Sequence, residues 1–182
     1  MARLPRLDRQ DMTPEQRRVA DAIRSGPRGG MGGPFEAWLR SPALADHAQQ
    51  LGAYCRFGTD LPKDVAELAI LLTGAHWKAQ FEFWAHTRLG RAAGLPDEVI
   101  EAIRTGRRPA LARPDLETAY VVVSEYFATN RLSDETYRRA IETFGERGLV
   151  DLIGLVGYYG LVSMTLNVFE VDLPQGETLP FA

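Results

Sequence analysis

Apolar residues recur at helical spacing along most of the chain, and this pattern predicts an all-α protein. In one segment the residues Val65, Leu68 and Leu72 fall on a single helical face. Similar patterns predict helices over 14–25, 42–57, 62–94, 115–129, 134–144 and 148–169. The third of these is long for one globular helix, so a break near 74–78 is an open alternative. The run 121–123 is three valines, but its flanks are helical and we expect no strand there.

Local signals mark the ends of the N-terminal segment. Thr13, Pro14 and Gln16 form the pattern of a capping box with proline at the first helical position. The glycine-rich and proline-rich stretch 26–34 is typical of a linker or surface loop. We therefore divide the chain into an N-terminal helix and arm, 1–33, and a helical domain, 34–182.

The final long segment, 148–169, is apolar on nearly every face. A helix of this kind has to be buried on all sides, so we expect it to be central or to lie at an interface. The tail 173–182 is expected to be an extended arm. Together these features favour contacts between subunits.

Composition and charge narrow the class of protein. The 182 residues fit one domain with appended arms, and the net charge of −3 lacks the basic excess that a nucleic-acid partner requires. The single cysteine, Cys55, excludes an internal disulfide and a CxxC dithiol, and we expect it to be a core residue. The first twelve residues contain no apolar signal core, and no long uninterrupted apolar run predicts a membrane span. We expect a cytoplasmic protein that does not interact with a membrane.

The most distinctive chemistry lies in the window 76–86. Glu82 and His86 stand at i and i+4, which places both side chains on one helical face. A carboxylate beside an imidazole raises the pKa of the imidazole and fixes its tautomer, so the pair is suited to proton transfer. The alternative is an ordinary ion pair on an exposed helix face.

Two further features bear on this site. Glu67 lies in an otherwise apolar stretch, so its carboxylate is either at the solvent edge of a helix or buried with a partner. His76, Glu82 and His86 are all possible zinc ligands. On one continuous helix, however, the two histidines are ten positions apart, which separates them by about 80° around the axis. We therefore expect no metal and no cofactor, and a metal hydrolase remains an alternative that needs a helix break near Lys78.

The sequence resembles the carboxymuconolactone decarboxylase family, which shares its fold with the alkyl hydroperoxidase D-like proteins. The resemblance covers about 44–174 and is strongest from Glu67 through the run 76–86 to Gly94–Pro96. Later matching pieces are 144–146, 152–154, Tyr158–Tyr159 and 167–169. The resemblance implies an all-helical bundle that assembles into homo-oligomers, either trimers or hexamers, with sites near subunit interfaces.

One branch of this family is excluded by the residues themselves. The hydroperoxidase branch uses a glutamate, then a CxxC pair, then a histidine. Glu67 and His86 match the outer positions, but the two cysteine positions are occupied by Ala79 and Glu82. Because the attacking species in that mechanism is a thiolate, a dithiol peroxidase cannot operate here. Glu82 in place of the second cysteine matches the decarboxylase branch.

The decarboxylase branch implies a cofactor-free lyase of aromatic compound catabolism. Its reaction is the decarboxylation of 4-carboxymuconolactone, which needs a general acid to deliver a proton as CO₂ leaves. The resemblance implies Glu82 and His86 as the acid–base pair and Glu67 as the residue that orients them. Residues expected to bind the small-molecule substrate are His76, Trp77, Tyr54 and Tyr158. Either Arg56 or Lys78 is expected to supply the cation for a substrate carboxylate.

Two further functions remain open from the sequence. One is an alkyl hydroperoxidase D-like antioxidant protein that works without the usual dithiol. The other is a non-catalytic helical oligomer that binds a ligand. Shared folds host many reactions, so the substrate stays an expectation that rests on the resemblance.

Overall fold

The computed structural model describes residues 2–27 and 30–181, and every regular element within these ranges is a helix. No strand occurs in the described residues, which confirms the all-α prediction. The elements are η1 (Arg9–Asp11), α1 (Pro14–Ser25), α2 (Phe35–Trp38), α3 (Pro42–Phe57), α4 (Lys63–His76), α5 (Gln80–Ala92), α6 (Asp97–Arg104), α7 (Pro114–Thr129) and α8 (Asp134–Val168).

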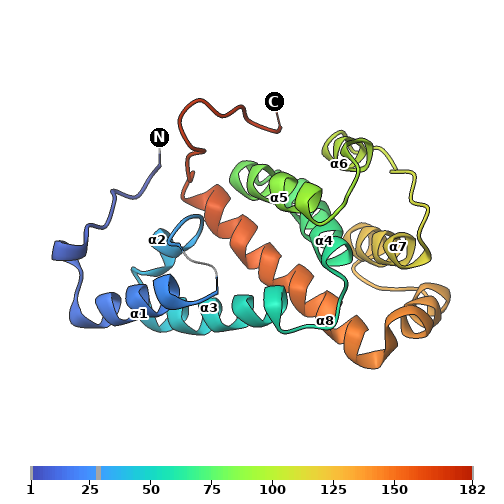
Figure 1. Ribbon diagram of the computed structural model, residues 1–182, viewed down its shortest axis with the longest axis horizontal. Coiled ribbons are helices and arrows are strands. Elements are labelled where there is room, and N and C mark those ends of the chain that lie inside the picture. Colours follow the sequence, from blue (N-terminus) through green and yellow to red (C-terminus); the bar gives the residue numbers. More distant parts are fainter. Residues whose placement is uncertain (1, 28–29, 182) are drawn as a thin grey trace.

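Helix α8 runs diagonally through the molecule, and α3, α4, α5 and α7 pack against it (Figure 1). Helix α4 contacts α5, α6, α7 and α8, so it lies at the centre of one half of the fold. In the other half, α3 packs on α8, and α1 and α2 pack on α3. Val19 and Ile23 of α1 are buried in the same hydrophobic core as α4 and α8. The N-terminal helix therefore packs on its own chain.

The predicted boundaries of two helices are confirmed. Helix α1 begins with the capping box: the Thr13 backbone N–H donates to Gln16 Oε1 at 2.8 Å, and the Gln16 backbone N–H donates to Thr13 Oγ1 at 3.2 Å. Helix α3 spans Pro42–Phe57, as the apolar pattern indicated. The short helix α2 was not predicted, because it follows directly on the glycine-rich stretch. It is fixed by Trp38, whose indole N–H donates to Thr165 on α8 at 2.9 Å.

The possible break within 62–94 is present and forms a corner between α4 and α5. The Lys78 N–H donates to the Ala75 carbonyl at 3.1 Å, and the Ala79 N–H donates to the Gly74 carbonyl at 2.9 Å. Lys78 has φ +51°, in the left-handed region. Together these features make a Schellman motif, the common way to end an α-helix. The corner turns α5 back along α4, and the two helices pack against each other.

The two predicted helices at the end of the chain form one element with a kink. Gly145 has φ +69° and ψ 175°, a backbone conformation that is open essentially only to glycine. The part that follows the kink is the diagonal helix of Figure 1. Its burial is incomplete: Val150 is 70% exposed and Val168 is 55% exposed. The helix is therefore central, as expected, but the single chain leaves part of its apolar surface uncovered.

Helix α8 is also the one helix, among the described residues, that is long and apolar enough to span a membrane. Its most apolar window has a mean hydropathy of 1.6, and 67% of that window is buried inside the fold. Core helices of soluble proteins meet the same criteria, so this feature carries little weight.

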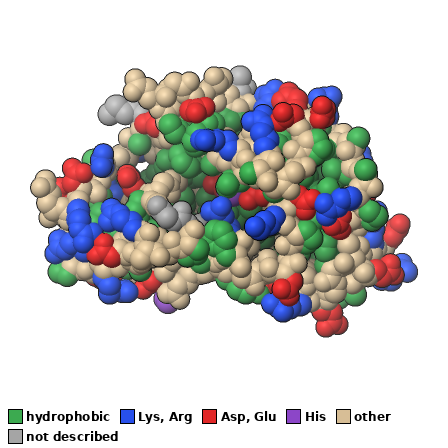
Figure 2. Space-filling view, in the orientation of Figure 1, with side chains coloured by type: hydrophobic (Ala, Val, Ile, Leu, Met, Phe, Trp, Pro, Cys, Tyr) green, Lys and Arg blue, Asp and Glu red, His purple; other side chains and the backbone are tan. Residues whose placement is uncertain are grey.

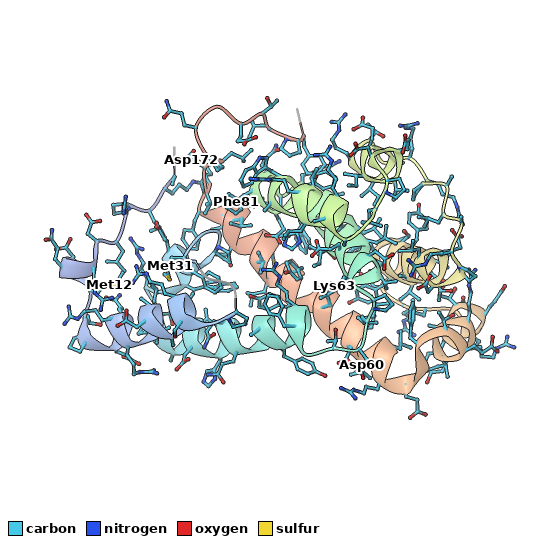
Figure 3. The ribbon with its side chains drawn as sticks, in the orientation of Figure 1. Met12, Met31, Asp60, Lys63, Phe81 and Asp172 are labelled. Carbon is cyan, nitrogen blue, oxygen red and sulfur yellow. The ribbon has the colours of Figure 1, made fainter. Side chains whose placement is uncertain are left out.

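Both ends of the described chain are held against the end of α8 or the start of α5. The Arg3 backbone N–H donates to the Phe169 carbonyl at 3.0 Å, and the Arg3 guanidinium pairs with Glu170 at 2.6 Å. Near the other end, Gln80 and the Phe181 backbone exchange two hydrogen bonds, of 2.6 and 2.9 Å. Figure 3 shows Phe81 at the start of α5 and Asp172 just beyond α8, on the side of the molecule where both chain ends run. The tail is extended, as predicted.

Candidate active site

His86 lies between two carboxylates in the interior of the fold. Its Nδ1 is 2.6 Å from Glu67 Oε2, and its Nε2 is 2.9 Å from Glu82 Oε1. The side chains of His86, Glu67 and Glu82 are 6%, 13% and 5% exposed. The structure thus brings the three sequence-predicted catalytic residues together. Glu82 and His86 share a face of α5, and the corner that precedes α5 brings Glu67 of α4 opposite them.

The two carboxylates decide the charge of His86. Burial alone lowers the pKa of this imidazole, but the neighbouring Glu82 and Glu67 carboxylates outweigh that effect and raise the pKa to about 9. At neutral pH the group is therefore an imidazolium. Each ring nitrogen carries a proton in this state, so both contacts are ion pairs.

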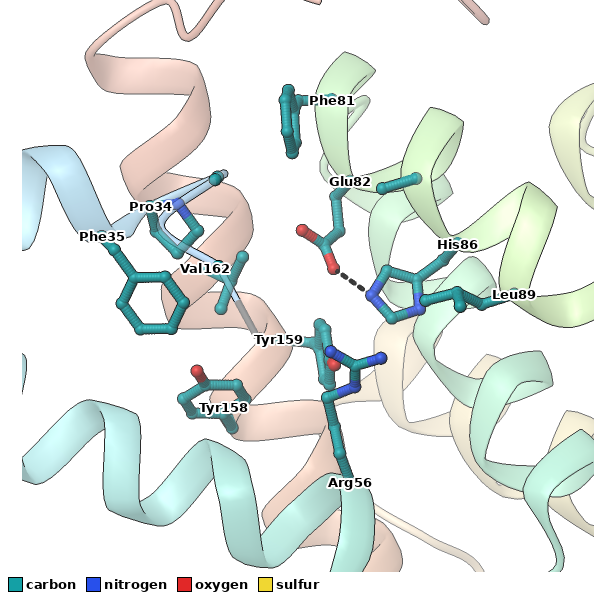
Figure 4. Close-up of a pocket in the computed structure, with 14 residues that line it drawn as sticks. Pro34, Phe35, Arg56, Phe81, Glu82, His86, Leu89, Tyr158, Tyr159 and Val162 are labelled. Atoms are coloured by element: carbon teal, nitrogen blue, oxygen red, sulfur yellow. Dashed lines mark ion pairs between the residues drawn. The ribbon is translucent and has the colours of Figure 1, made fainter. Parts of the chain in front are cut away.

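The two contacts of His86 differ in geometry. The contact with Glu67 is an aligned hydrogen bond. The contact with Glu82 has ion-pair distance without hydrogen-bond alignment, and among the described residues Glu82 Oε1 has no hydrogen-bond partner. This oxygen is buried against the His86 ring, and in Figure 4 the other carboxylate oxygen of Glu82 points toward the cavity.

Glu82 and His86 line a cavity of about 190 Å³. Figure 2 shows a hollow with hydrophobic side chains inside it and basic side chains at its edge. The close-up in Figure 4 shows Glu82 and His86 on one side of the cavity and the tyrosines of α8 on another. The Tyr159 ring packs edge-on against His86, with 5.0 Å between ring centroids. The other described lining residues come from the glycine-rich segment and from α2, α3, α5 and α8: Gly30, Gly32, Gly33, Pro34, Phe35, Arg56, Phe81, Ala85, Leu89, Tyr158 and Val162.

Besides His86, one cationic residue lies among the described lining residues, and it is Arg56 from the end of α3. Its guanidinium carbon lies 5.1 Å from the centre of the Phe57 ring, a cation–π contact that helps hold the side chain. Lys78, the other candidate from the sequence, does not line the cavity, and its Nζ lies 4.9 Å from the centre of the Phe181 ring. The structure therefore places Arg56, and not Lys78, beside the carboxylate cluster.

The predicted substrate-binding residues separate into two groups. Tyr158 lines the cavity, as the resemblance implied. His76, Trp77 and Tyr54, which were also expected to bind the substrate, do not line this cavity. His76 stacks on Phe127 of α7 with 4.0 Å between ring centroids, and burial lowers its pKa. The reason is the corner: His76 is the last residue of α4, and its ring is directed to α7 rather than to the cavity.

Tyr54 and Trp77 have other surroundings. The Tyr54 hydroxyl donates to Asp151 Oδ1 on α8 at 2.8 Å, and this hydrogen bond raises the pKa of Tyr54. Trp77 is 38% exposed, and its backbone carbonyl accepts a hydrogen bond from the Asn167 side chain at 2.7 Å. Both residues therefore form hydrogen bonds that connect α8 with neighbouring segments.

The cavity-lining residues that could not be identified from the sequence come from segments that are distant along the chain. Phe35 and Val162 supply apolar wall, and no pattern in the sequence connects them with the window 76–86. For Tyr159 the one indication in the sequence is that the pair Tyr158–Tyr159 belongs to the residues that resemble the family. Within 2–27 and 30–181 no group of three or more His, Cys, Asp and Glu side chains is arranged to hold a metal ion. Cys55 is buried, as predicted, and does not line the cavity.

Comparison with known proteins adds no relative. No protein-family model matches the sequence. A search of curated proteins found none that is similar to it.

Proposed function

We propose that this protein is a cofactor-free lyase with an alkyl hydroperoxidase D-like fold. In this proposal it acts like a carboxymuconolactone decarboxylase on a small carboxylated lactone or a similar substrate. One observation carries the proposal: an imidazole is held between two buried carboxylates in the wall of a cavity. The carboxylates raise the pKa of this imidazole to about 9, so the cluster holds a proton beside the cavity at neutral pH.

The proposed reaction uses each member of the cluster in a different way. The bond between the substrate carbon and its carboxylate breaks, and the electron pair enters the conjugated lactone. The lactone carbon that receives this charge takes a proton from the Glu82–His86 pair, and CO₂ leaves. His86 Nε2 lies 2.9 Å from Glu82 Oε1, so a proton can pass from the ring to the carboxylate that faces the cavity. Water restores the proton after product release.

Glu67 has a positioning role in this proposal. Its Oε2 accepts the Nδ1 proton of His86, which fixes the ring so that Nε2 points to Glu82. Because its carboxylate also holds the imidazole in the charged form, Glu67 keeps a proton available at neutral pH.

The antioxidant alternative has less support. A peroxide-reducing protein of this branch needs a thiolate in contact with its substrate. Cys55, the single cysteine, is 2% exposed and is absent from the cavity wall. The non-catalytic alternative predicts that substitution of Glu82 leaves every measured function intact.

The decisive experiment is a decarboxylation assay with 4-carboxymuconolactone on the wild type, Glu82→Gln and Glu98→Gln. Glu98 is an exposed residue of α6 and serves as the matched control. We expect turnover by the wild type and by the control, and a loss of about 100-fold or more in Glu82→Gln, since a general acid typically contributes that much. Equal turnover in Glu82→Gln would remove the proposed acid, and no turnover in the wild type would remove the proposed substrate.

We also propose that the protein forms a homo-oligomer, as the resemblance implies. Support comes from an apolar face of α8 that the chain leaves uncovered: Val150, Ile153, Met164 and Val168 are all at least 37% exposed. An uncovered apolar face of this kind is typical of a subunit contact. Sedimentation analysis should give a mass of three or six chains, and Val150→Lys combined with Met164→Lys should lower it. A monomeric wild type at micromolar concentration contradicts the proposal.

A further inference from the structure

The first turn of α5 carries Glu82, and this turn depends on contacts from outside the helix. Helix α5 begins at Gln80, and Ala79 at its N-cap position supplies no side-chain hydrogen bond. Helix ends without a capping side chain fray readily, because their first backbone N–H groups have no partner inside the helix. Glu82 Oε1 also lacks a hydrogen-bond partner among the described residues. The position of this carboxylate is therefore set by whatever packs against the turn.

The C-terminal tail packs against this turn through a single residue, Phe181. The Phe181 backbone N–H donates to Gln80 Oε1 at 2.9 Å, and the Phe181 carbonyl accepts from Gln80 Nε2 at 2.6 Å. The Phe181 ring packs edge-on against Phe83 with 4.9 Å between ring centroids, and Lys78 Nζ lies 4.9 Å from the centre of the same ring. Two of these partners precede Glu82 along the chain and one follows it. One tail residue thus contacts both the corner and the first turn of α5.

Two other helices hold the turn and the tail in place. A side-chain carbon at Gly74 of α4 would lie 3.6 Å from the Phe83 backbone nitrogen and 3.8 Å from Glu82 Cγ, so α4 approaches the turn closely. On α6, the Arg104 guanidinium donates to the Pro180 carbonyl at 2.8 Å. Figure 1 shows the tail leaving α8 and running past α5 toward α6. The first turn of α5 is therefore held by α4 and by the tail, and the tail is itself anchored on α6.

Glu82 and His86 depend on this turn to different degrees. His86 lies one turn further along α5, where its Nδ1 makes an aligned hydrogen bond of 2.6 Å with Glu67 of α4. The Glu82 carboxylate lies 2.9 Å from His86 Nε2 without hydrogen-bond alignment. A displacement of the first turn therefore moves Glu82 away from His86 and leaves the contact between His86 and Glu67 in place.

We propose that Phe181 is a positioning residue of the active site, which holds Glu82 against His86 through the first turn of α5. The tail is then a working part of the site, although none of its described residues lines the cavity. The catalytic consequence rests on the proposed lyase function, in which the Glu82–His86 pair delivers the proton. The geometric claim is independent of the reaction and can be tested without a substrate.

The first test measures the pKa of His86 by NMR titration of its ring protons. The titratable side chains that contact His86 or share its cavity come from four helices: Glu67, Glu82, Arg56, Tyr158 and Tyr159. An anion beside an imidazolium holds its proton, so Glu82→Gln should lower the pKa of His86. Phe181→Ala should lower it in the same direction and by a smaller amount, because Glu82 is displaced and not removed.

A double variant shows whether Phe181 acts through Glu82. In the Glu82→Gln background, Phe181→Ala should leave the pKa of His86 where Glu82→Gln alone puts it, because the group that Phe181 positions is gone. The inference is overturned if Phe181→Ala alone keeps the wild-type pKa. It is equally overturned if Phe181→Ala lowers the pKa as much in the Glu82→Gln background as in the wild type.

Three further variants complete this test. Leu179→Ala is the matched control, since Leu179 belongs to the same tail and is 56% exposed, and it should keep the wild-type pKa of His86. Phe181→Tyr keeps the aromatic ring and should also keep the wild-type value. Gln80→Ala removes the two hydrogen bonds to the Phe181 backbone and should lower the pKa. It decides the question if Phe181→Ala does not fold, and an unchanged pKa in it then overturns the inference.

The second test connects the positioning role with turnover. With 4-carboxymuconolactone as substrate, Phe181→Ala should lower kcat about tenfold and change KM less than about twofold, because Glu82 acts in the transition state. A change confined to KM overturns the inference, since the tail would then act on substrate binding. If the wild type gives no turnover while the pKa of His86 still depends on Phe181, the lyase proposal fails and the positioning role of the tail remains.

Discussion

Glu67 and His86 belong to different helices, and yet Glu67 Oε2 and His86 Nδ1 are only 2.6 Å apart. The contact crosses the packing surface between α4 and α5, which the corner at Lys78 folds against each other. It converts a helix-surface pair, Glu82 and His86, into a buried cluster of three ionisable groups. A buried imidazolium is stable here because carboxylates flank both of its nitrogens.

The stability of the protein should fall as pH rises from about 6.5 to about 9. His86 has a pKa of about 9 when folded, above the value of 6.5 for an unperturbed histidine. The folded state therefore holds a proton that the unfolded state releases, and this stabilisation is complete below pH 6.5 and is lost as pH passes 9. The shift corresponds to about 3 kcal/mol. Urea unfolding at a series of pH values measures it, and the slope should flatten in Glu67→Gln combined with Glu82→Gln. An unchanged slope in that variant would assign the effect to other groups.

Removing the imidazole should destabilise the fold strongly. His86→Ala leaves Glu67 and Glu82 buried without the cation between them, and breaking a buried pair in this way typically costs about 3–5 kcal/mol. His47→Ala is the control, because His47 is exposed on α3. The free energy of unfolding at pH 7 measures both variants. A loss below about 1 kcal/mol in His86→Ala would show that the cluster contributes little to stability.

Two glycines of α8 should respond in opposite directions to substitution by alanine. Gly145 has φ +69° and ψ 175°, so Gly145→Ala should cost about 1–3 kcal/mol of stability. Gly154 is exposed within the helix, and a side chain there would meet open space. In a chain kept monomeric by Val150→Lys and Met164→Lys, Gly154→Ala should therefore stabilise the fold by up to about 1 kcal/mol. Thermal unfolding of the two variants checks the prediction, and loss of stability of similar size in both would contradict it.

The C-terminal tail should become mobile when Gln80 loses its side chain. Gln80 makes two hydrogen bonds with the Phe181 backbone, and the Arg104 guanidinium donates one to the neighbouring Pro180 carbonyl at 2.8 Å. In Gln80→Ala we expect faster hydrogen exchange and faster proteolysis at 173–181, with little change in global stability. Gln50→Ala, on the surface of α3, is the control. Equal protection of the tail in both variants would show that Phe181 is held by its ring, which packs on Phe83.

The sequence predicts most of the helices because their signals are local. The capping box at Thr13 and the apolar spacing of α3 depend on neighbouring residues alone, and both predictions are confirmed. The contact between Glu82 and His86 is predictable for the same reason, since i and i+4 neighbours meet on any helix. For Glu67 the sequence left two alternatives, and the structure shows the buried one.

The cavity itself was not predictable from local signals. Arg56 and Phe35 reach it from α3 and α2, and their positions depend on how these helices pack on each other and on α8. His76 and Trp77 were expected in the cavity because they are close to Glu82 along the chain. Residues at the end of one helix and the start of the next point in different directions once a corner separates them.

The corner at Lys78 fixes the number of residues that can connect α4 to α5. Each added residue would turn α5 by about 100° relative to α4 and move it by about 1.5 Å along its axis. A single insertion between His76 and Gln80 would then carry Glu82 and His86 away from Glu67 together, while their own contact stays intact. Substitutions in this loop should consequently be tolerated far better than changes in its length, and length variants offer a way to detach the orienting carboxylate without altering any residue of the cluster.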